Sequence, residues 1–498
     1  MDRLATGIRA LALTLLLAVA LAAMESIPPD PGWAPTDRFR FFLGIDLIFG
    51  AIMGMITATA AAMLVPPRDS RWTWPAGALC VVLLISQVGI LATGLDSGLS
   101  AAQSWRASTP LPKLASPDAR SVVLVSVDTW RADSLQHMPL LQSRTQTGRV
   151  YERALSPSSW TLPAMASLMT GLPVHGHGAG RRAHPEQTGV RTGISENIPT
   201  LAQSLREKGY VSAAVLSNPY LGANLGFHKG LDRALDGSRR ALLFEQLRRS
   251  LLLGSLLPEN GDSAPELVEI ALQRWGQLED GRSFLWVHLS EPHAPYGQAE
   301  PCEMPKCFPS WVPARRGSEA VDPAAVQALY QQDLAQLDVA LEELLVHIDS
   351  QRTVVIVVGD HGEAFGPAPD IEHGHSFAPE ITQVPLLVWG PGIDPGQVSR
   401  SVNLMDVHRA ILEYADRGTL QALDPGAPDS LTPMASVLFG EPGSACSDGS
   451  NWLQDRGQGV EVLAGEHSAE LAGCIPGTLP EGERLDVDGA LLSLGYVE

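Results

Sequence analysis

Three long apolar stretches, at about residues 8–24, 41–65 and 74–95, occupy most of the first hundred positions of the chain. The second and third are long enough to cross a hydrocarbon core of about 30 Å as helices. The first is shorter and ends in small residues, so a cleaved signal peptide and a membrane span both fit it. We predict a membrane region over residues 1–96, with buried core helices of a soluble protein as the alternative.

Basic residues set the expected orientation of this region. Arg3 and Arg9 precede or begin the first stretch, and Arg68 and Arg71 lie in the short loop between the second and the third. Because short loops with Lys and Arg stay in the cytoplasm, the chain beyond the third stretch is expected on the other side. The pattern therefore predicts an integral membrane protein whose main domain is extracytoplasmic.

The apolar pattern changes after the membrane region. Residues 97–119 are rich in Ser, Pro and Ala, which indicates a stalk. From residue 120 to about 415, short runs of Val, Leu and Ile alternate with helical patterns, as expected for parallel strands covered on both faces. The strand candidates are 121–127, 211–216, 284–289, 353–358 and 384–388, and the helix candidates are 199–208 and 323–348. This alternation predicts an α/β domain with a mostly parallel sheet and helices on both faces.

The last part of the chain, residues 416–498, is looser and rich in Pro, Gly and Ser. A weak strand pair, 460–463 with 490–494, indicates a small C-terminal α+β unit. The even number of cysteines beyond the membrane region favours disulfides in an exported domain. Local pairing would join Cys302 to Cys307 and Cys446 to Cys474, although four cysteines allow three connectivities and zinc binding is an alternative.

The formal net charge of -20 bears on partners. Proteins that bind nucleic acids neutralise phosphates with stripes of Lys and Arg, so this charge argues against a nucleic-acid partner.

Metal-ligating residue types follow two of the predicted strands. Asp128 comes directly after the run 121–127, and Asp360 and His361 follow the run 353–358 closely. Open α/β sheets place ligands at the carboxyl ends of their strands, so Asp128 is well placed for a metal, and Asp360 with His361 forms a pair of possible metal ligands. Carboxylate with imidazole suits manganese or zinc better than calcium, which prefers oxygen ligands alone and is kept as an alternative. The pattern predicts a divalent-metal site, although Asp128 taken alone fits a helix cap equally well.

Thr161 stands at the start of a predicted helix, because Pro163 suits a first helical turn. The N–H groups and the dipole at a helix N-terminus stabilise an anion. A hydroxyl in this place is suited to attack a phosphoryl or sulfuryl centre, with a metal lowering its pKa. A plain helix cap is the alternative interpretation.

Histidines gather in two further segments. His288, Glu291 and His293 lie in one of them, and His373 and His375 lie in the other. An isolated histidine is usually structural, but several near predicted strand ends favour a role in the site.

Together these segments resemble the sulfatase family and its neighbours in the alkaline phosphatase superfamily, over about residues 120–415. The matching segments are Asp128–Asp133, Thr161–Gly171, Glu291–Tyr296, Gly359–Glu363, Glu372–His375 and Val384–Gly392. The resemblance implies an alkaline-phosphatase-like fold and an ester hydrolase.

Carried over position by position, the resemblance also implies roles. The implied metal ligands are Asp128, Thr161, Asp360 and His361. Thr161 is in addition at the nucleophile position, and His293 and His373 fall where the family contacts the anionic ester group. Further candidates for substrate binding are His375, Glu291 and Asn218.

The chain departs from sulfate-cleaving members of the family at three places. Thr161 and Met165 stand where those enzymes have Cys or Ser and then Arg. Threonine cannot give the formylglycine aldehyde, because oxidation of its secondary alcohol yields a ketone. Thr129 replaces a second Asp, and the family's lysine segment is absent, since the chain reads Ser217–Tyr220 there.

These departures favour a phosphate or phosphonate ester, or transfer of a phospho-headgroup, through a plain Thr nucleophile. In this the chain resembles the phosphodiesterase, phosphonate-hydrolase and headgroup-transferase branches. The alternatives are a sulfuric ester hydrolase and an inactive binding protein that keeps the fold. We expect the substrate to be a small-molecule, glycan or lipid-linked ester.

Overall fold

The computed structural model describes residues 120–180, 182–184, 187–236, 263–278, 281–294, 296–297, 322–366, 371–435, 443–455 and 459–476. The three apolar stretches, the stalk, Cys302, Cys307 and the strand pattern at 490–494 lie outside these ranges. Their assignments therefore stay predictions. Within the described ranges, no helix combines the length and the hydrophobicity that a membrane crossing needs.

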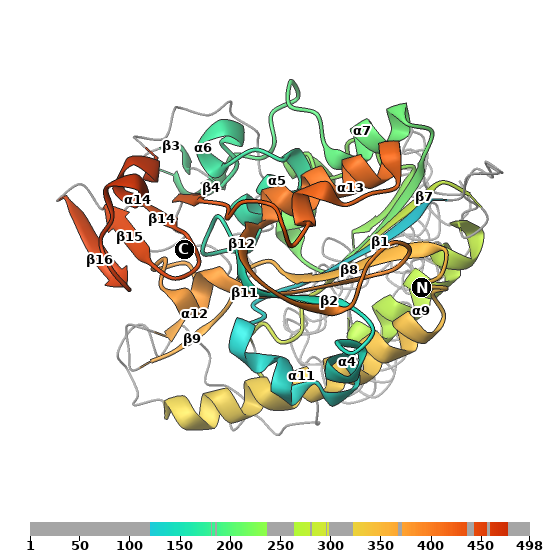
Figure 1. The fold of residues 1–498 in the computed structure, drawn as a ribbon, viewed down its shortest axis with the longest axis horizontal. Helices are drawn as coiled ribbons and strands as arrows, with labels where there is room; N and C mark the ends of the chain where they lie inside the picture. Colours follow the sequence, from blue (N-terminus) through green and yellow to red (C-terminus); the bar gives the residue numbers. More distant parts are fainter. Residues whose placement is uncertain are drawn as a thin grey trace, which may run out of the picture. The chain divides into compact units, whose positions relative to one another are not determined.

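A mixed eight-stranded sheet forms the centre of the described chain, in the order β12-β2-β11-β8-β1-β7-β5-β6 (Figure 1). Its strands are β1 (Ser121–Val127), β2 (Arg149–Leu155), β5 (Val211–Leu216), β6 (Arg233–Asp236), β7 (Ser283–Leu289), β8 (Thr353–Gly359), β11 (Gln383–Trp389) and β12 (Gly396–Asn403). Neighbours are parallel except where β11 runs against both β8 and β2. The predicted α/β class is confirmed, and the sheet is mixed because β11 is reversed.

Helices cover both faces of this sheet, with α5, α7 and α13 on one side and α4, α9 and α11 on the other (Figure 1). The α-helices are α4 (Pro139–Arg144), α5 (Thr161–Thr170), α6 (Val174–His177), α7 (Leu201–Glu207), α9 (Ala264–Leu278), α11 (Pro323–Val346), α12 (Pro379–Thr382), α13 (Leu404–Arg417) and α14 (Ala469–Cys474). The 3-10 helices are η1 (Ala132–His137), η2 (Pro219–Leu221), η3 (Ala223–Leu225) and η4 (Gln421–Leu423). The predicted helices at 199–208 and 323–348 correspond to α7 and α11.

Local sequence sets where the main helices begin. Thr200 and Gln203 form a reciprocal capping box at the start of α7, and Asn403 with Asp406 forms another at α13. At the start of α11, the side chain of Asp322 accepts from the backbone of Ala324. These caps satisfy backbone N–H groups that a helix leaves without intrahelical partners.

The hydrophobic core lies between the sheet and its helices. Val122 and Leu124 of β1 are fully buried in one cluster with Leu162 of α5 and Ile411 of α13. The alternate residues, such as Val123, point to the opposite face and are also fully buried. Burial of both faces explains why the central strands are continuous apolar runs.

A separate antiparallel sheet forms the C-terminal part of the described chain. Its strands are β13 (Thr432–Ala435), β14 (Ser444–Ser447), β15 (Trp452–Asp455) and β16 (Val460–Ala464), in that order. The strand predicted at 460–463 is confirmed as β16, which pairs with β15. A disulfide between Cys446 and Cys474, one of the predicted pairs, joins β14 to the end of α14.

Two short strand pairs complete the secondary structure. They are β3 (Arg182–His184) with β4 (Gln187–Arg191), and β9 (Ala364–Phe365) with β10 (Ile371–Glu372). The second pair lies between Glu363 and the histidines predicted at 373 and 375, and so shapes the loop that carries them.

Candidate active site

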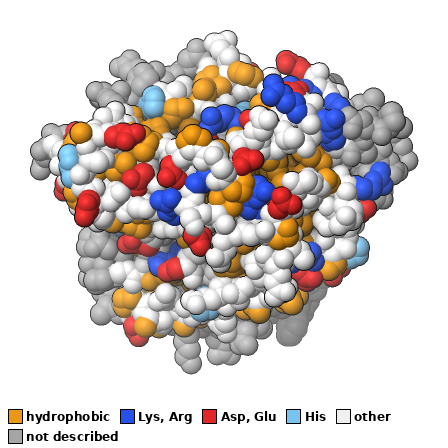
Figure 2. All heavy atoms as spheres, in the orientation of Figure 1, with side chains coloured by type: hydrophobic (Ala, Val, Ile, Leu, Met, Phe, Trp, Pro, Cys, Tyr) orange, Lys and Arg blue, Asp and Glu red, His pale blue; other side chains and the backbone are white. Residues whose placement is uncertain are grey.

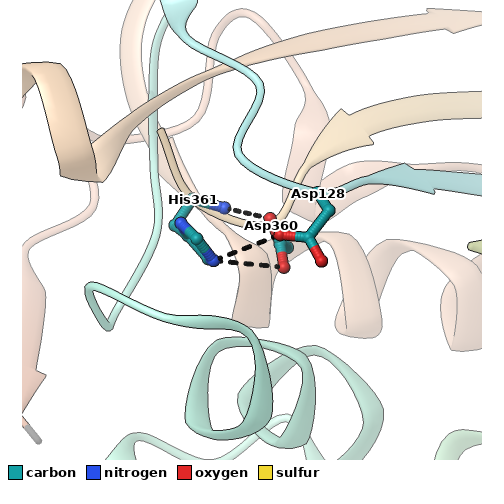
Figure 3. Close-up of side chains that lie close together, drawn as sticks. All are labelled: Asp128, Asp360 and His361. Atoms are coloured by element: carbon teal, nitrogen blue, oxygen red, sulfur yellow. Dashed lines mark hydrogen bonds and ion pairs between the residues drawn. The ribbon is translucent and has the colours of Figure 1, made fainter. Parts of the chain in front are cut away.

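The three metal-ligating residues predicted from the sequence meet at the carboxyl ends of two neighbouring strands. Asp128 follows β1, and Asp360 and His361 follow β8. The last residues of these strands, Val127 and Gly359, are paired in parallel register, and Asp360 N–H donates to the Val127 carbonyl at 3.0 Å. The register therefore brings the residues after both strands to one point, as Figure 3 shows.

One ligand atom from each of Asp128, Asp360 and His361 lies within 4.8 Å of the others. His361 Nε2 is 3.5 Å from Asp128 Oδ1 and 3.6 Å from Asp360 Oδ2. His361 Nδ1 lies 2.9 Å from the carbonyl of Gly362. Because a carbonyl only accepts, Nδ1 carries the proton and Nε2 presents its lone pair to the two carboxylates.

The electrostatics of this group favour a cation. Burial and the charge of Asp128 raise the pKa of Asp360 well above its usual range. Burial also acts to raise the pKa of Asp128, but the charge of His293 and the His288 hydrogen bond outweigh it and hold this pKa well below its usual range. Burial and the charge of His373 lower the pKa of His361 to about 3, so His361 is a neutral imidazole at physiological pH.

Residues Asp128, Asp360 and His361 fit a divalent metal. All three are fully buried, and Asp360 Oδ2 has no hydrogen-bond partner among the described residues. Buried carboxylates require a counter-charge. The two carboxylates and one imidazole form a donor set that suits manganese or zinc.

Asp360 is held in place by the backbone on either side of it. Its Oδ1 accepts from Thr129 N–H at 3.1 Å and from His361 N–H at 2.6 Å. Thr129 takes a φ of 51°, which is uncommon for a β-branched residue and aims its N–H at this oxygen. The strained conformation thus orients a candidate metal ligand.

Thr161 is the first residue of α5, with Trp160 as its N-cap. Its Oγ1 lies 3.3 Å from His361 Nε2 and 3.4 Å from Asp128 Oδ1. Asn218, which caps η2, donates from Nδ2 to Asp128 Oδ2 at 2.6 Å and to Thr161 Oγ1 at 3.3 Å. The hydroxyl therefore lies among the predicted ligands, at the positive end of a helix dipole.

Two histidines lie beside the metal-ligating group. The ring of His373 is 4.5 Å from that of His361 and 5.0 Å from that of His293, measured between centroids. His373 Nδ1 lies 3.0 Å from Glu363 Oε1, and Tyr296 OH donates to Glu363 Oε2 at 2.8 Å. Burial raises the pKa of Glu363 to about 7, against the opposing charge of His293.

The loop of His373 reaches the site because β11 is reversed. This loop precedes β11, so in a parallel strand it would lie at the opposite edge of the sheet. In the antiparallel strand its amino end lies at the carboxyl ends of β1 and β8. Gly374 N–H also donates to the carbonyl of Ser159, two residues before Thr161.

The other substrate-binding candidates lie in three loops: Asn218 follows β5, Glu291 follows β7, and His375 lies in the loop of His373. Oε1 of Glu291 accepts from the backbone of Ala264 at 2.6 Å, so this oxygen is engaged at the start of α9. His375 is half-buried, two residues beyond His373. Asn218 contacts both Asp128 and Thr161, as described above.

The comparisons with known proteins identify the family. The family model named Sulfatase matches residues 120–417, more than half of the chain. The chain belongs to the sulfatase family. It is therefore a hydrolase of a family that acts on ester bonds. A comparison with curated proteins gives no match.

Solved structures that are similar to this chain show the same fold. A phosphonate monoester hydrolase from Silicibacter pomeroyi has a TM-score of 0.52 at 17% identity, covering 71% of this chain and 90% of its own. The phosphonate monoester hydrolase of Agrobacterium radiobacter has a TM-score of 0.52 at 18% identity, covering 76% and 94%. A putative sulfatase from Bacteroides thetaiotaomicron has a TM-score of 0.51 at 15% identity, covering 69% and 85%. At these identities the likeness shows the fold alone.

Two residues of this sulfatase-family site were missed as functional candidates. Glu363 lies in a matching segment, but only the structure shows that it links Tyr296 to His373. His288 was noted as one of several histidines, and the structure places it 3.5 Å from Asp128 Oδ2. Their spacing from the strand ends was the available signal, and it does not reveal which partner each side chain contacts.

Proposed function

We propose that the chain cleaves a phosphate or phosphonate ester, or transfers its phospho-group, with Thr161 as the nucleophile. The observation that carries the proposal is the place of Thr161 Oγ1. It lies 3.3 to 3.5 Å from ligand atoms of Asp128 and His361, at the first position of a ten-residue helix.

The nature of this nucleophile favours phosphorus over sulfur. A hydroxyl that attacks phosphorus gives a phosphothreonine, which water can hydrolyse. The aldehyde by which the family's sulfate-cleaving members release sulfate cannot form from Thr161. In addition, Met165 is buried and uncharged where those members have Arg.

Asp128, Asp360, His361 and Thr161 would hold the divalent metal. When bound, the metal would lower the pKa of the Thr161 hydroxyl and neutralise charge on the phosphoryl oxygens. Asn218 donates to Asp128 and to Thr161, so it keeps both oxygens in place. The N-terminus of α5 contributes a favourable field for the anionic group.

The proposed reaction has two halves. In the first, Thr161 loses its proton to water and its oxygen bonds to phosphorus, while the bond from phosphorus to the leaving oxygen breaks. A protonated His293 or His373 gives its proton to that leaving oxygen. In the second half, water or an acceptor hydroxyl attacks phosphorus and gives its proton to the histidine that lost one in the first half. The bond from phosphorus to Thr161 breaks, and Thr161 regains a proton from water.

We further propose that the catalytic domain is tethered to a membrane and faces away from the cytoplasm. The three apolar stretches and the disulfide between Cys446 and Cys474 support this placement, because disulfides persist in oxidising compartments. A membrane-bound ester, such as a lipid-linked one, would then lie within reach of the site. Protease would be added to cells whose outer layers are permeable and whose cytoplasmic membrane is intact. It should digest the domain, and protection of the domain would contradict the orientation.

A substrate panel tests the chemistry. Purified full-length protein would be assayed on matched p-nitrophenyl phosphate diesters, phosphonate monoesters and sulfate esters, each with manganese, zinc or calcium. We expect phosphate or phosphonate esters to react fastest, with manganese or zinc, and chelation to abolish activity. Faster turnover of the sulfate ester would contradict the proposal.

A further inference from the structure

Three buried side chains form a path from the sheet to the ligand Asp128. Trp286 Nε1 donates to Ser126 Oγ at 2.9 Å, and Ser126 Oγ lies 2.8 Å from His288 Nδ1. His288 Nε2 lies 3.5 Å from Asp128 Oδ2. Ser126 on β1 and His288 on β7 are directly paired in parallel register, and both are fully buried.

The direction of each hydrogen bond follows from what each group is able to donate. The indole N–H only donates, so Ser126 Oγ accepts from Trp286. The Ser126 proton has two acceptors within reach, His288 Nδ1 at 2.8 Å and the Val287 carbonyl at 3.4 Å. Only the shorter distance lies in the usual range for a hydroxyl donor. The Ser126 proton therefore goes to Nδ1, and a neutral imidazole that accepts at Nδ1 carries its own proton on Nε2.

The surroundings of Nε2 are compatible with the same tautomer. This nitrogen faces a carboxylate oxygen of Asp128 in a fully buried site. The Nε2 of His361 also faces carboxylates, but there the ring proton is held at Nδ1 by the Gly362 carbonyl. In His288 the Ser126 proton occupies Nδ1, so the ring proton is left to Nε2, where it is attracted to the Asp128 oxygen.

With the proton of His288 on Nε2, the two oxygens of Asp128 have different surroundings. Oδ2 receives Asn218 Nδ2 at 2.6 Å and faces the His288 N–H, whereas Oδ1 faces His361 Nε2 at 3.5 Å. Asp360 shows the same division, because two backbone N–H groups hold its Oδ1 and its Oδ2 faces His361 Nε2 at 3.6 Å. Each carboxylate is thus held by one oxygen, and its other oxygen would be left to bind a metal.

We propose that His288, held by Ser126 and Trp286, is a positioning residue that orients Asp128 as a donor and does not itself bind the metal. Such partners of ligating residues commonly change metal affinity by about 10- to 100-fold. The inference rests on the metal site of the proposed function and is independent of the substrate and of the nucleophile.

The first experiment measures the Kd of manganese for the full-length protein by the EPR signal of the free ion. His288→Leu and Ser126→Ala should each weaken binding by about 10- to 100-fold. His288→Gln places an amide N–H near the position of Nε2, so it should bind within about threefold of the wild type. Ser126→Ala serves as the second variant if His288→Leu does not fold.

A matched control separates positioning from general stability. Ser167 Oγ lies 2.9 Å from His177 Nε2, and His177 Nδ1 accepts from the Ala179 backbone, so this is another buried Ser–His pair. Ser167→Ala should lower the thermal stability of the protein and leave the manganese Kd unchanged. An unchanged Kd in both His288→Leu and Ser126→Ala would overturn the inference.

The second experiment asks whether His288 is a donor or a ligand. Pulsed EPR of bound manganese should show coupling to one imidazole nitrogen, lost in His361→Gln and retained in His288→Gln. Loss of nitrogen coupling in His288→Gln would overturn the proposal, because His288 would then be a ligand. Absence of manganese binding to the wild-type chain would contradict the metal site itself and this inference with it, whereas a sulfate preference would affect only the proposed substrate.

Discussion

At the scale of single residues, the site depends on how each polar atom is held. Thr161 lies at the first position of α5, where its hydroxyl is near both Asp128 and His361. The amide of Asn218 donates hydrogen bonds to both Thr161 and Asp128. The carbonyl of Gly362 accepts from His361 Nδ1 and so sets the tautomer of His361. The buried Oδ2 of Asp360 completes a group that a divalent cation would neutralise.

Replacement of Thr161 tests its role directly. Thr161→Ala should lower turnover by at least about 1,000-fold, because the covalent route is lost. Thr161→Ser keeps a hydroxyl in the same place and should retain activity within about tenfold of the wild type. Steady-state kinetics would measure turnover, and a direct manganese titration would show that the Ala variant still binds metal. Normal turnover by Thr161→Ala would exclude it as the nucleophile.

The contacts of Glu363 predict that its replacement slows some esters more than others, depending on the leaving group. Glu363 accepts from His373 and from Tyr296, so it sets the orientation of His373, one of the two proposed proton donors. General acid catalysis contributes about 100-fold or more, chiefly for leaving groups that need a proton. Glu363→Gln should therefore slow esters of alkyl alcohols by about 100-fold and p-nitrophenyl esters by less than about tenfold. Equal losses for the two ester types would show that Glu363 acts on structure alone.

At the scale of elements, strand order and direction place the site. β1 and β8 are adjacent and parallel, so the residues after them meet, and reversed β11 brings the loop of His373 to the same edge. α5 packs against α13. Gly171, with a φ of 69°, is the C-cap residue of α5. A Cβ at Gly171 would lie 2.6 Å from the ring of His408, so the end of α5 and α13 are closely fitted.

This contact predicts a pH dependence of stability. Burial lowers the pKa of His408 to about 4, against the hydrogen bond to the Leu168 carbonyl. The folded state therefore binds a proton less readily than the unfolded state, whose histidine has a pKa of about 6.5. The contribution of neutral His408 is complete above about pH 6.5 and is lost as the pH falls toward 4.

A non-ionisable variant measures this effect. His408→Asn keeps a donor near the position of Nδ1 and cannot become charged. Between pH 7 and pH 4.5 the wild type should lose about 2 kcal/mol more free energy of unfolding than this variant. Urea denaturation at the two pH values would measure the difference. Identical pH dependence in both proteins would show that His408 does not titrate on unfolding.

The strands show which parts of the fold can be predicted from the sequence. The buried central strands β1, β5, β7, β8 and β11 were predicted because their apolar runs are continuous. The other three strands of the eight-stranded sheet, β2, β6 and β12, were not predicted. They carry charged or polar residues, such as Arg149, Arg233 and Arg400, which interrupt the apolar pattern. The direction of β11 could not be predicted, because a strand's own sequence does not contain its orientation relative to its neighbours.

The candidate site was more predictable than the strand order. Asp128, Thr161, Asp360 and His361 could be named because they stand at strand ends and a helix start and match segments typical of the sulfatase family. The structure brings them together. The partners of His288 and Glu363 could not, because they come from segments far apart in the sequence.

At the scale of the molecule, the sulfatase family's α/β domain carries a small C-terminal sheet closed by a disulfide. On the face shown in Figure 2, acidic and basic side chains are interspersed among hydrophobic ones. Trp452 of β15 donates to Thr382 at the end of α12, next to β11, so the two sheets are tied by a buried hydrogen bond.

The disulfide should contribute to stability and leave metal binding unaffected. Its residues are 28 positions apart, and closing a loop of this length restricts the unfolded chain. Cys446→Ala with Cys474→Ala should lower the free energy of unfolding by about 2–4 kcal/mol. Urea denaturation and a manganese titration of the same protein would test both parts. A loss of manganese affinity would show that the C-terminal sheet supports the metal site.

The central claim is that Thr161 attacks phosphorus, and the most direct test is the mass of the protein itself. Full-length protein would be mixed briefly with a phosphate diester, quenched in acid, and analysed by intact-mass and peptide mass spectrometry. We expect a mass increase equal to the transferred phosphoryl group, located on Thr161 and absent from Thr161→Ala. Turnover of the diester with Thr161 unmodified, or modification of another residue in its place, would contradict it.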